Sequence, residues 1–428
     1  MTELSVLSSS SRGKPILVIG GGIAGLTVAL EAAEAGCQVI LVEKSPYLGG
    51  RVARMHQYFP KLCPPTCGLE INLRRLRDNP QITVLTLAEV EGISGSSGDY
   101  EVTVRLSPRF VTEACTLCGA CAEACPAERR DEFNYGLSKT KAAYFPHGVA
   151  YPACYVIDRA SCPDGCQACK QACLYGAIDL DQKTEKKIMR VAAVVAATGW
   201  APYDAAKIGN LGFGKFPNVV TNVLFERMAA VDGPTGGRIL RPSDSKASQA
   251  VAFVQCAGSR DENHLPYCSA VCCAASIKQA AYLRSLSTEA RASIFYIDIR
   301  TLGRLEEFYA AVAADENVKF IKGKVARVDE EPGTRDLLVT AEDVLAGTKK
   351  TERFDLVVLA TGIVPQTEGL PKEFVLDEFR FVRAPENGKG FYVAGCAHRP
   401  EEVSATVQEA TGAALKALQC VARISQHG

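Results

Sequence analysis

The first apolar stretch of the chain is followed by a glycine-rich turn and then by a helical pattern. Pro15 to Gly20 is short and apolar, as expected for a buried parallel strand, and apolar residues recur at helical spacing to about Ala35. Gly36 is placed to end that helix, and Gln38 to Val42 predicts a second strand. The order strand, helix, strand predicts a βαβ unit of the kind that opens a Rossmann-type domain.

Further apolar runs along the chain predict more buried strands. They are Val191 to Ala196, Ala250 to Gln255, Phe354 to Ala360 and Gly390 to Gly395. A helical pattern starts at about Val403, after the last of these runs. Alternating buried strands and helices predict an α/β fold.

The glycine-rich turn has the features of a dinucleotide site. Gly20 suits the tight turn, Gly22 allows a pyrophosphate to approach the backbone, and Gly25 allows close packing of helix and strand. The phosphates are expected at the helix N-terminus, because its free N–H groups and the helix dipole favour anions. Glu43 ends the second strand, where a carboxylate can accept hydrogen bonds from the adenosine ribose. The alternative is a glycine-rich turn with a structural role only.

Two other segments favour FAD as the nucleotide. Gly49-Gly50-Arg51 resembles a segment of flavoproteins with two dinucleotide domains, and in those proteins the last strand and turn, here ending at Gly395, carry the ribityl chain. Cys396 replaces the acid that usually follows this glycine. The residues predicted to bind FAD are Gly20, Gly22, Ile23, Ala24, Gly25, Glu43, Lys44, Gly50, Arg51, Thr198, Gly199, Thr361, Gly362, Gly395, Cys396 and Ala405.

The region from Ser248 to Ile299 stands where relatives of such flavoproteins bind NAD(P)H. Its first strand is followed by Cys256-Ala257-Gly258-Ser259-Arg260 instead of a glycine-rich turn. We therefore expect a second Rossmann-like domain whose nicotinamide site is degenerate.

Composition narrows the class of protein. The chain has 428 residues, with 48 basic and 48 acidic side chains, which gives no indication of a nucleic-acid surface. Met1 to Lys14 is polar and serine-rich without the apolar core of a secretory signal, and no apolar run reaches the roughly 18 residues of a spanning helix. We expect a cytoplasmic protein without a transmembrane segment, in which the 18 cysteines serve mainly as metal ligands.

Eight of the cysteines form two runs with the spacing of two-cluster ferredoxins. The first run extends from Cys115 to Cys125-Pro126, and the second, from Cys162 to Cys173, has one extra residue in its first gap. The last cysteine of each such run ligates the cluster of the other run. We therefore expect one [4Fe–4S] cluster on Cys115, Cys118, Cys121 and Cys173, and another on Cys125, Cys162, Cys166 and Cys169. A zinc ribbon is the alternative, and Cys154 is an alternative to Cys162.

Five other cysteines gather in two places, Cys63 with Cys67 and Cys268 with the adjacent Cys272 and Cys273. We predict a third [4Fe–4S] cluster near the flavin on Cys63, Cys67, Cys268 and Cys272, with Cys273 as the alternate fourth ligand. A redox disulfide between Cys63 and Cys67, or buried structural thiols, are the alternatives. The remaining five cysteines are expected to be buried free thiols; they are Cys37, Cys154, Cys256, Cys396 and Cys420.

No catalytic residue is predicted, since the sequence suggests neither a Ser/His/Asp triad nor a substrate-binding acid–base pair. His398 lies close to the expected flavin ring, where it either tunes the flavin or is a solvated loop residue. Trp200 and Tyr203 are expected to be packing residues. The substrates are then expected to be other redox proteins.

Long strings of the sequence resemble the HdrA family, the A subunits of heterodisulfide reductases. The strings are VIGGGIAGL, LGGRVARMHQYFP, CTLCGACAEACP, EFNYGL and VQCAGSRDENHLPYCSAVCC. Long methanogen members of the family carry additional cluster domains. The compact length and the segment CPPTCGLEINL are most similar to the A subunits of the quinone-interacting membrane-bound oxidoreductases of sulfate reducers.

This resemblance implies a role in sulfate respiration. It implies electron transfer between a membrane quinone pool and cytoplasmic adenylylsulfate reductase. The implied partners are a second flavin and iron–sulfur subunit of the same family and a haem-containing, quinone-oxidising membrane subunit, through which the chain attaches to the inner membrane. The alternatives are an electron-bifurcating component of a soluble complex and a stand-alone flavin disulfide reductase.

The fold expected from all these features has two Rossmann-like domains, as in thioredoxin and glutathione reductases. The FAD-binding domain is expected in three pieces, at 1–111, 182–235 and 346–428. A ferredoxin-like two-cluster module at 112–181 and the second Rossmann-like domain at 236–345 interrupt it.

Overall fold

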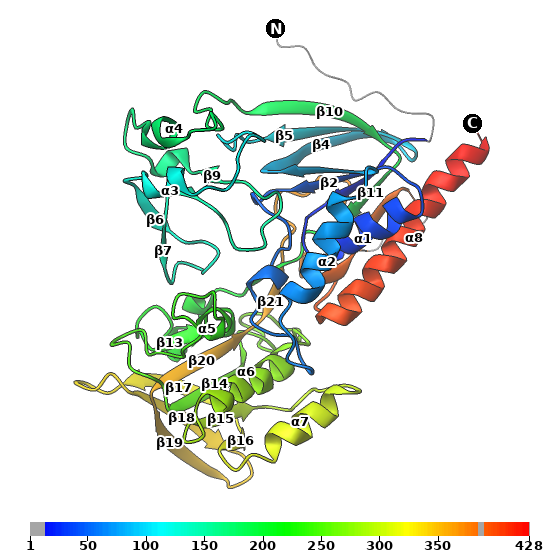
Figure 1. Ribbon diagram of the computed structural model, residues 1–428. Coiled ribbons are helices and arrows are strands. Elements are labelled where there is room, and N and C mark those ends of the chain that lie inside the picture. Colours follow the sequence, from blue (N-terminus) through cyan, green and yellow to red (C-terminus); the bar gives the residue numbers. More distant parts are fainter. Residues whose placement is uncertain (1–12, 384–388, 428) are drawn as a thin grey trace. The chain divides into compact units, whose positions relative to one another are not determined.

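The computed structural model describes residues 13–383 and 389–427, and the chain divides into two compact units (Figure 1). Unit 1 comprises Met1–Ala53, Thr66–Trp200 and Pro365–Gly428, and unit 2 comprises Arg54–Pro65 and Ala201–Val364. Most of the serine-rich N-terminus, where the sequence predicts no secretory signal, lies outside the described residues. No helix within the described ranges combines the length and the apolar character needed to cross a bilayer.

Unit 1 contains a parallel five-stranded sheet in the order β22-β11-β1-β2-β3. Its strands are β1 (Ile16–Ile19), β2 (Val39–Glu43), β3 (Ile82–Thr86), β11 (Ala193–Ala196) and β22 (Phe391–Val393). Strands β1, β2, β11 and β22 are buried along their whole length, because both faces of the sheet are covered.

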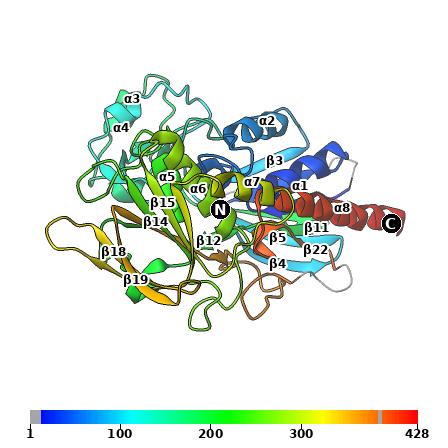
Figure 2. The same ribbon diagram turned by 90° about the horizontal axis from the view of Figure 1, so that it is seen from below.

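Helices cover one face of this sheet and a second, antiparallel sheet covers the other. The helices are α1 (Ile23–Glu34), α2 (Thr66–Arg77) and α8 (Val403–His427), and α1 and α8 lie side by side (Figure 2). The antiparallel sheet has the order β10-β5-β4. Its strands are β4 (Ala88–Ser96), β5 (Asp99–Leu106) and β10 (Glu185–Val191).

A small module is inserted between β5 and β10, where Leu106 pairs with Glu185 across the two strands. Its elements are α3 (Ala120–Glu123), α4 (Ala168–Ala172), β6 (Glu128–Arg130), β7 (Lys139–Lys141), β8 (Ala143–Tyr144) and β9 (Val156–Ile157). Its core is built partly from the cysteines themselves, since Cys121, Cys125 and Cys169 pack with a few aliphatic residues. Because this core is small, metal ligation by the cysteine thiols would contribute much of the module's stability.

Unit 2 contains a second parallel sheet, in the order β13-β20-β14-β15-β16. Its strands are β13 (Val219–Thr221), β14 (Ala250–Ala257), β15 (Arg291–Tyr296), β16 (Val318–Lys322) and β20 (Leu356–Thr361). The helices of the unit are α5 (Asn222–Ala229), α6 (Cys272–Leu286) and α7 (Leu305–Ala313). One face of the sheet packs against a three-stranded antiparallel sheet of β17 (Val325–Glu330), β18 (Leu337–Asp343) and β19 (Thr348–Phe354).

The remaining elements are short. Strands β12 (Trp200–Pro202) and β21 (Ile363–Pro365) pair with each other. The 3₁₀ helices are η1 (Val52–Arg54), η2 (Arg159–Ser161), η3 (Ala205–Lys207), η4 (Gly209–Leu211) and η5 (Gly395–Ala397).

Two pieces of the chain lie in a different sheet from the one that the sequence predicts. Residues 201–235 and 346–364, expected in the FAD-binding domain, contribute β13, α5 and β20 to unit 2. The physical reason is that β20 pairs with β13 on one side and with β14 on the other. A buried apolar strand followed by Thr-Gly fits either Rossmann-like sheet, so the local pattern does not distinguish them.

Candidate cofactor sites

In the glycine-rich turn of unit 1, two glycines pack closely against the chain and a third faces open space. A Cβ atom on Gly20, whose φ is +111°, would lie 2.3 Å from the carbonyl oxygen of Ala197, and a Cβ on Gly25 would lie 1.8 Å from that of Gly20. A Cβ on Gly22 would meet nothing within 4 Å. Gly20 and Gly25 therefore allow close packing of the chain, whereas Gly22 leaves the backbone open at the start of α1, as a bound pyrophosphate requires.

The carboxylate of Glu43 is fixed beside this turn. It is buried, and it accepts hydrogen bonds from the backbone N–H groups of Gly21 at 2.6 Å and of Ser45 at 2.7 Å. Nearby in the same unit, the buried hydroxyl of Thr198 has no hydrogen-bond partner within the described part of the chain. An oriented acid and an unsatisfied hydroxyl fit a polar cofactor, because a buried polar group without a partner is costly. Ile23 and Ala24 begin α1, whereas the side chain of Lys44 is exposed.

Arg51 links the predicted FAD segment to the inserted module. Its guanidinium lies 4.6 Å from the ring centre of Trp200 and donates to the hydroxyl of Tyr135 at 3.1 Å. Gly50, with φ of +55°, packs against Gly22, since a Cβ there would lie 2.9 Å from the Cα atom of Gly22. Trp200, which the sequence predicts to be a packing residue, has a defined place beside this segment through its contact with Arg51.

The turn at Gly395 contains a carboxylate that no sequence motif indicates. The N–H of Gly395 donates to Glu409 of α8 at 2.7 Å, and Nδ1 of His398 lies 2.6 Å from the other oxygen of the same carboxylate. Burial tends to raise the pKa of Glu409, but His398 and the Gly395 N–H more than compensate and lower it. The carboxylate missing at Cys396 is thus replaced near this turn by one from a residue fourteen positions after Gly395.

Two predicted FAD residues after Gly395 have other partners. Cys396 is buried, which raises the pKa of its thiol to about 11, and its Sγ lies 3.4 Å from the carbonyl oxygen of Glu401. The N–H of Ala405 donates to the side chain of Glu402 at 2.8 Å. A flavin carbonyl at this helix start would have to displace Glu402, so the predicted role of Ala405 requires a local rearrangement.

Thr361 and Gly362 belong to unit 2, whereas the other residues predicted to bind FAD belong to unit 1. The Thr361 hydroxyl donates to Asn222 Oδ1 at 3.1 Å. A Cβ on Gly362 would lie 2.3 Å from the hydroxyl oxygen of Ser259. Both residues therefore have clear packing roles within unit 2.

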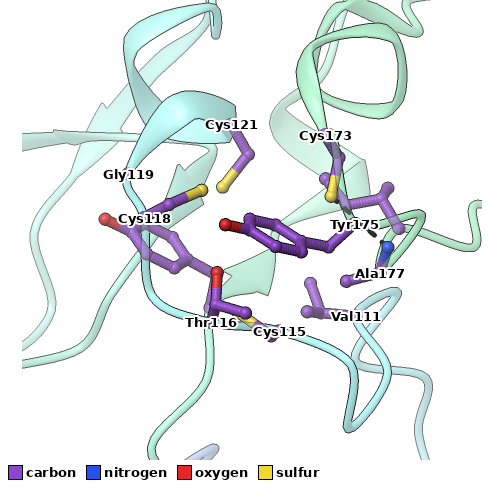
Figure 3. A pocket seen from close by; sticks show the side chains of 11 residues that line it. Val111, Cys115, Thr116, Cys118, Gly119, Cys121, Cys173, Tyr175 and Ala177 are labelled. Atoms are coloured by element: carbon purple, nitrogen blue, oxygen red, sulfur yellow. Dashed lines mark hydrogen bonds between the residues drawn. The ribbon is translucent and has the colours of Figure 1, made fainter.

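The first predicted set of cluster ligands lines one pocket of the inserted module. Cys115, Cys118, Cys121 and Cys173 surround it, and Figure 3 shows the sulfurs of Cys118, Cys121 and Cys173 directed into the same space. Burial and the neighbouring thiol of Cys115 raise the pKa of Cys121 to about 11. The N–H of Ala177 donates to the Cys173 sulfur at 3.3 Å, a contact of the kind that stabilises negative charge on a ligating thiolate.

The second predicted set also comes together in the module. Burial raises the pKa of the Cys169 thiol, and the charges of Cys162, Cys125 and Cys166 raise it further. Cys125, Cys162 and Cys169 also pack in the same hydrophobic cluster of the module. Cys154, the alternative to Cys162, lies near Arg109 and the first set. Burial has the largest effect and raises the pKa of its thiol; the charge of Arg109 lowers this pKa and that of Cys115 raises it.

A third group of thiols lies in unit 2, and its membership differs from the predicted one. Burial raises the pKa of Cys272, and the charges of Cys256, Cys273 and Cys268 raise it further. Cys272 and Cys273 begin α6, and Cys268 lies in the loop before it. Cys256, which the sequence predicts to be a structural thiol, is therefore the fourth member of this group.

The backbone is irregular at Cys256. Between the pairs Val254–Leu359 and Ala257–Thr361, strand β14 has one residue more than β20, which makes a β-bulge. Cys256 itself has φ of +55°, a left-handed conformation that is unfavourable for a residue other than glycine. Bulges and left-handed residues of this kind concentrate at functional sites.

Cys63 and Cys67 are both exposed and belong to different units. The S–H of Cys63 points to the carbonyl oxygen of Lys61 at 3.8 Å, and Cys67 lies in the first turn of α2. The predicted ligand set that joins them to Cys268 and Cys272 remains a prediction. All 18 cysteines are free thiols in the structure, including Cys63 and Cys67.

In the described part of the chain, no three His, Cys, Asp or Glu side chains come close enough to hold a single metal ion.

Comparison with known proteins agrees with both kinds of site. Residues 15–60 match the family described as FAD dependent oxidoreductase, and residues 108–128 match the 4Fe-4S binding domain. The iron-sulfur A subunit of the CoB–CoM heterodisulfide reductase of Methanocaldococcus jannaschii is 39% identical over 419 residues, which cover 94% of this chain and 63% of the relative. The A subunit of the ferredoxin/F(420)H(2)-dependent CoB-CoM heterodisulfide reductase of Methanosarcina acetivorans is 38% identical, over 98% of this chain and 54% of the relative. The chain thus spans less than two thirds of the length of these relatives.

Solved structures with a similar fold are thioredoxin reductases. The enzyme from T. acidophilum aligns with a TM-score of 0.52 at 14% identity, over 97% of this chain and 99% of its own. The enzyme from Lactococcus lactis aligns with a TM-score of 0.50 at 12% identity, over 96% and 99%. The predicted α/β flavoprotein fold of the thioredoxin reductase type is confirmed.

Proposed function

Because the chain belongs to the HdrA family of heterodisulfide reductase A subunits, which are FAD-dependent oxidoreductase components, we propose that it relays electrons between FAD and three [4Fe–4S] clusters. The observation that carries the proposal is the presence of three separate groups of four thiols in a chain that also has an open dinucleotide turn. FAD exchanges one or two electrons and a cluster exchanges one, so together they convert between the two kinds of transfer.

For the inserted module we propose the crossed ligand sets. One cluster is held by Cys115, Cys118, Cys121 and Cys173, and the other by Cys125, Cys162, Cys166 and Cys169. The pocket that the first four cysteines line and the mutual pKa effects among the second four support this assignment. The position of Cys154 beside Arg109 favours Cys162 as the ligand.

For the third cluster we propose Cys256, Cys268, Cys272 and Cys273, so that Cys256 and Cys273 replace Cys63 and Cys67 of the predicted set. Two further features of unit 2 support this choice. The bulge turns Cys256 at the carboxyl end of β14, the edge of a parallel sheet where ligands usually bind. Cys272 and Cys273 stand at the N-terminus of the 15-residue helix α6, whose dipole favours the negative charge of a thiolate-ligated cluster.

The same edge of the sheet favours an electron-relay function and disfavours that of a nicotinamide-dependent disulfide reductase. The glycine-rich turn that would receive a pyrophosphate is replaced by the bulge and by Cys256. Within this proposal the chain's residues hold the clusters, exclude water from the buried thiols and bind the adenosine and pyrophosphate parts of FAD through Glu43 and the open turn at Gly22.

The place of the chain in metabolism is proposed from the resemblance of its sequence. We propose that it relays electrons between a membrane quinone pool and adenylylsulfate reductase, in a complex with a second member of its family and a haem-containing membrane subunit. Peripheral attachment to the inner membrane through that haem protein is part of the proposal. Purification from native membranes tests it, because co-elution of a haem protein is expected and elution as a free monomer would contradict it.

Iron content tests the ligand assignment. The anaerobically reconstituted protein should contain about twelve irons and one FAD per chain, at four irons per cluster. Cys268→Ser should lose about four irons and keep FAD, whereas the pair Cys63→Ala and Cys67→Ala should keep all of the iron. The reverse pattern would restore the predicted set with Cys63 and Cys67 as ligands.

A further inference from the structure

Two arginines of unit 2 lie beside the third group of thiols. Arg260 follows Cys256 by four residues in a left-handed conformation with φ of +55°. Burial raises the pKa of the Cys256 thiol, and the positive charge of Arg260 opposes this effect. Asp298 raises the pKa of the Arg300 guanidinium, and the charge of Cys268 raises it further. The S–H of Cys273 donates to the backbone carbonyl oxygen of Asp298, with Sγ 3.7 Å from that oxygen. Three of the four thiols therefore lie beside Arg260, Asp298 or Arg300.

Asp298 connects the two arginines. One of its carboxylate oxygens pairs with Arg260, and the other accepts from Arg300 at 3.2 Å and 3.3 Å. Without this acid the two guanidinium groups would repel each other at close range. Near neutral pH the three side chains together leave one net positive charge beside the thiols, because both arginines are protonated and, against the opposing effect of burial, they lower the pKa of Asp298, which keeps it ionised.

The arrangement differs from an ordinary surface ion-pair network because it adjoins the thiols: Asp298 binds both arginines through its carboxylate and accepts from Cys273 through its backbone carbonyl. The two guanidinium charges therefore lie near the sulfurs that would carry part of the charge of a cluster. Hydrogen bonds to ligating sulfurs and nearby positive charge stabilise the reduced state, which carries one more negative charge than the oxidised state.

We propose that Arg260 and Arg300, held by Asp298, are positioning residues that raise the reduction potential of the third cluster. The proposal rests on the ligand set proposed above for that cluster. When the cluster accepts one electron, no bond in these side chains breaks and no proton is required, because the arginines supply fixed charge. The side chain of Arg260 is 24% exposed and that of Arg300 is 47% exposed, so water screens Arg300 more strongly and Arg260 should have the larger effect.

Potentiometric titration of the anaerobically reconstituted protein with dithionite, followed by electron paramagnetic resonance, tests the proposal. The signal of the third cluster is identified as the one that Cys268→Ser lacks. In Arg260→Gln the ratio of reduced to oxidised cluster at a fixed potential should fall about tenfold, which corresponds to about 59 mV for one electron. Arg300→Gln should shift the same signal in the same direction by a smaller amount. The other two clusters should titrate as in the parent protein.

Matched variants distinguish an effect on the reduction potential of the third cluster from an effect on folding. Arg304→Gln removes the same charge from an exposed position four residues beyond Arg300 and should leave the potential unchanged. Arg260→Lys keeps the charge and should recover much of the parent potential, so it covers the case in which Arg260→Gln loses iron. Full iron content with an unchanged potential in both glutamine variants would overturn the role of the arginines. A parent protein with only about eight irons would overturn the third cluster, and the arginine proposal with it.

Discussion

Lys278 and Glu226 form a buried ion pair in unit 2, and its removal gives a sharp test of what holds residues 54–60 in place. The side chains are 2% and 8% exposed, and Lys278 Nζ lies 2.7 Å from Glu226 Oε1. Lys278 also donates to the carbonyl oxygen of Gln57 at 2.7 Å, and the N–H of His56 donates to Glu226 at 3.1 Å. The pair thus attaches the segment before Cys63 to helices α5 and α6.

Glu226 is ionised at neutral pH despite its burial. Burial alone would raise the pKa of its carboxyl, but the charge of Lys278 and hydrogen bonds from Gln279 and Tyr282 lower it. The substitution Lys278→Met keeps the apolar stem and removes the charge, so it leaves a buried carboxylate without its cation. Breaking a buried pair in this way costs about 3–5 kcal/mol. Because Gln279 and Tyr282 still donate to the carboxylate, we expect a loss near the lower end, about 3 kcal/mol.

Hydrogen–deuterium exchange is the suitable assay, because a chain with two units need not unfold in one step. A loss of about 3 kcal/mol corresponds to about a hundredfold faster exchange through local opening, at about 1.4 kcal/mol per tenfold. We expect this change in peptides from α5, α6 and residues 54–60 of Lys278→Met, and little change in unit 1. Lys324→Met provides the control, since the ion pair of Lys324 with Asp261 is more exposed and should contribute less than about 1 kcal/mol.

A double variant distinguishes the effect of an uncompensated buried charge from the effect of lost packing. In Lys278→Met with Glu226→Gln no charge is left buried, so most of the protection should return. If Lys278→Met changes exchange no more than Lys324→Met does, the buried pair does not hold this segment. If the double variant is as unprotected as the single one, lost packing and not the uncompensated charge is the cause.

Two other predictions concern the cofactors. Gly22→Val places a side chain in the open space above the turn, so the purified protein should contain far less than one FAD per chain, as measured by absorbance of the released flavin; full occupancy would show that pyrophosphate does not pass this position. Cys118→Ser should lose about four irons, whereas Cys154→Ser should keep its iron content, and iron loss in Cys154→Ser would make Cys154 a ligand.

Sites built from neighbouring residues have patterns that a sequence can show directly. The spacing of Gly20, Gly22 and Gly25 indicates the geometry of the turn, because each glycine meets a different steric requirement within it. The ferredoxin-like cysteine runs are similar, since a cubane cluster dictates short spacings and a crossed last ligand. Both features depend on a few consecutive residues, so the sequence pattern contains most of the information.

Sites assembled by the fold could not be predicted in this way. Cys256 lies twelve residues before Cys268, at a bulge in β14 with a left-handed backbone, and its charge acts on the thiol of Cys272 at the start of α6. Glu409 reaches the Gly395 turn because α8 begins beside it, a relation that no local motif encodes. The one sequence signal for Cys256 is its position at the end of a predicted buried strand, in place of a turn glycine.

The end of β14 explains why a Rossmann-like domain can exchange one kind of anion for another. In such domains the carboxyl edge of the sheet and the N-terminus of the next helix form a place where negative charge is stabilised. A glycine-rich turn makes this place accessible to a pyrophosphate, because glycine leaves the N–H groups uncovered. Here Cys256 occupies the turn and Cys272 and Cys273 begin the helix, so the same dipole faces thiols. Arg260 and Arg300 add positive charge at this edge, which is what a thiolate-ligated cluster needs and what an uncharged thiol core does not.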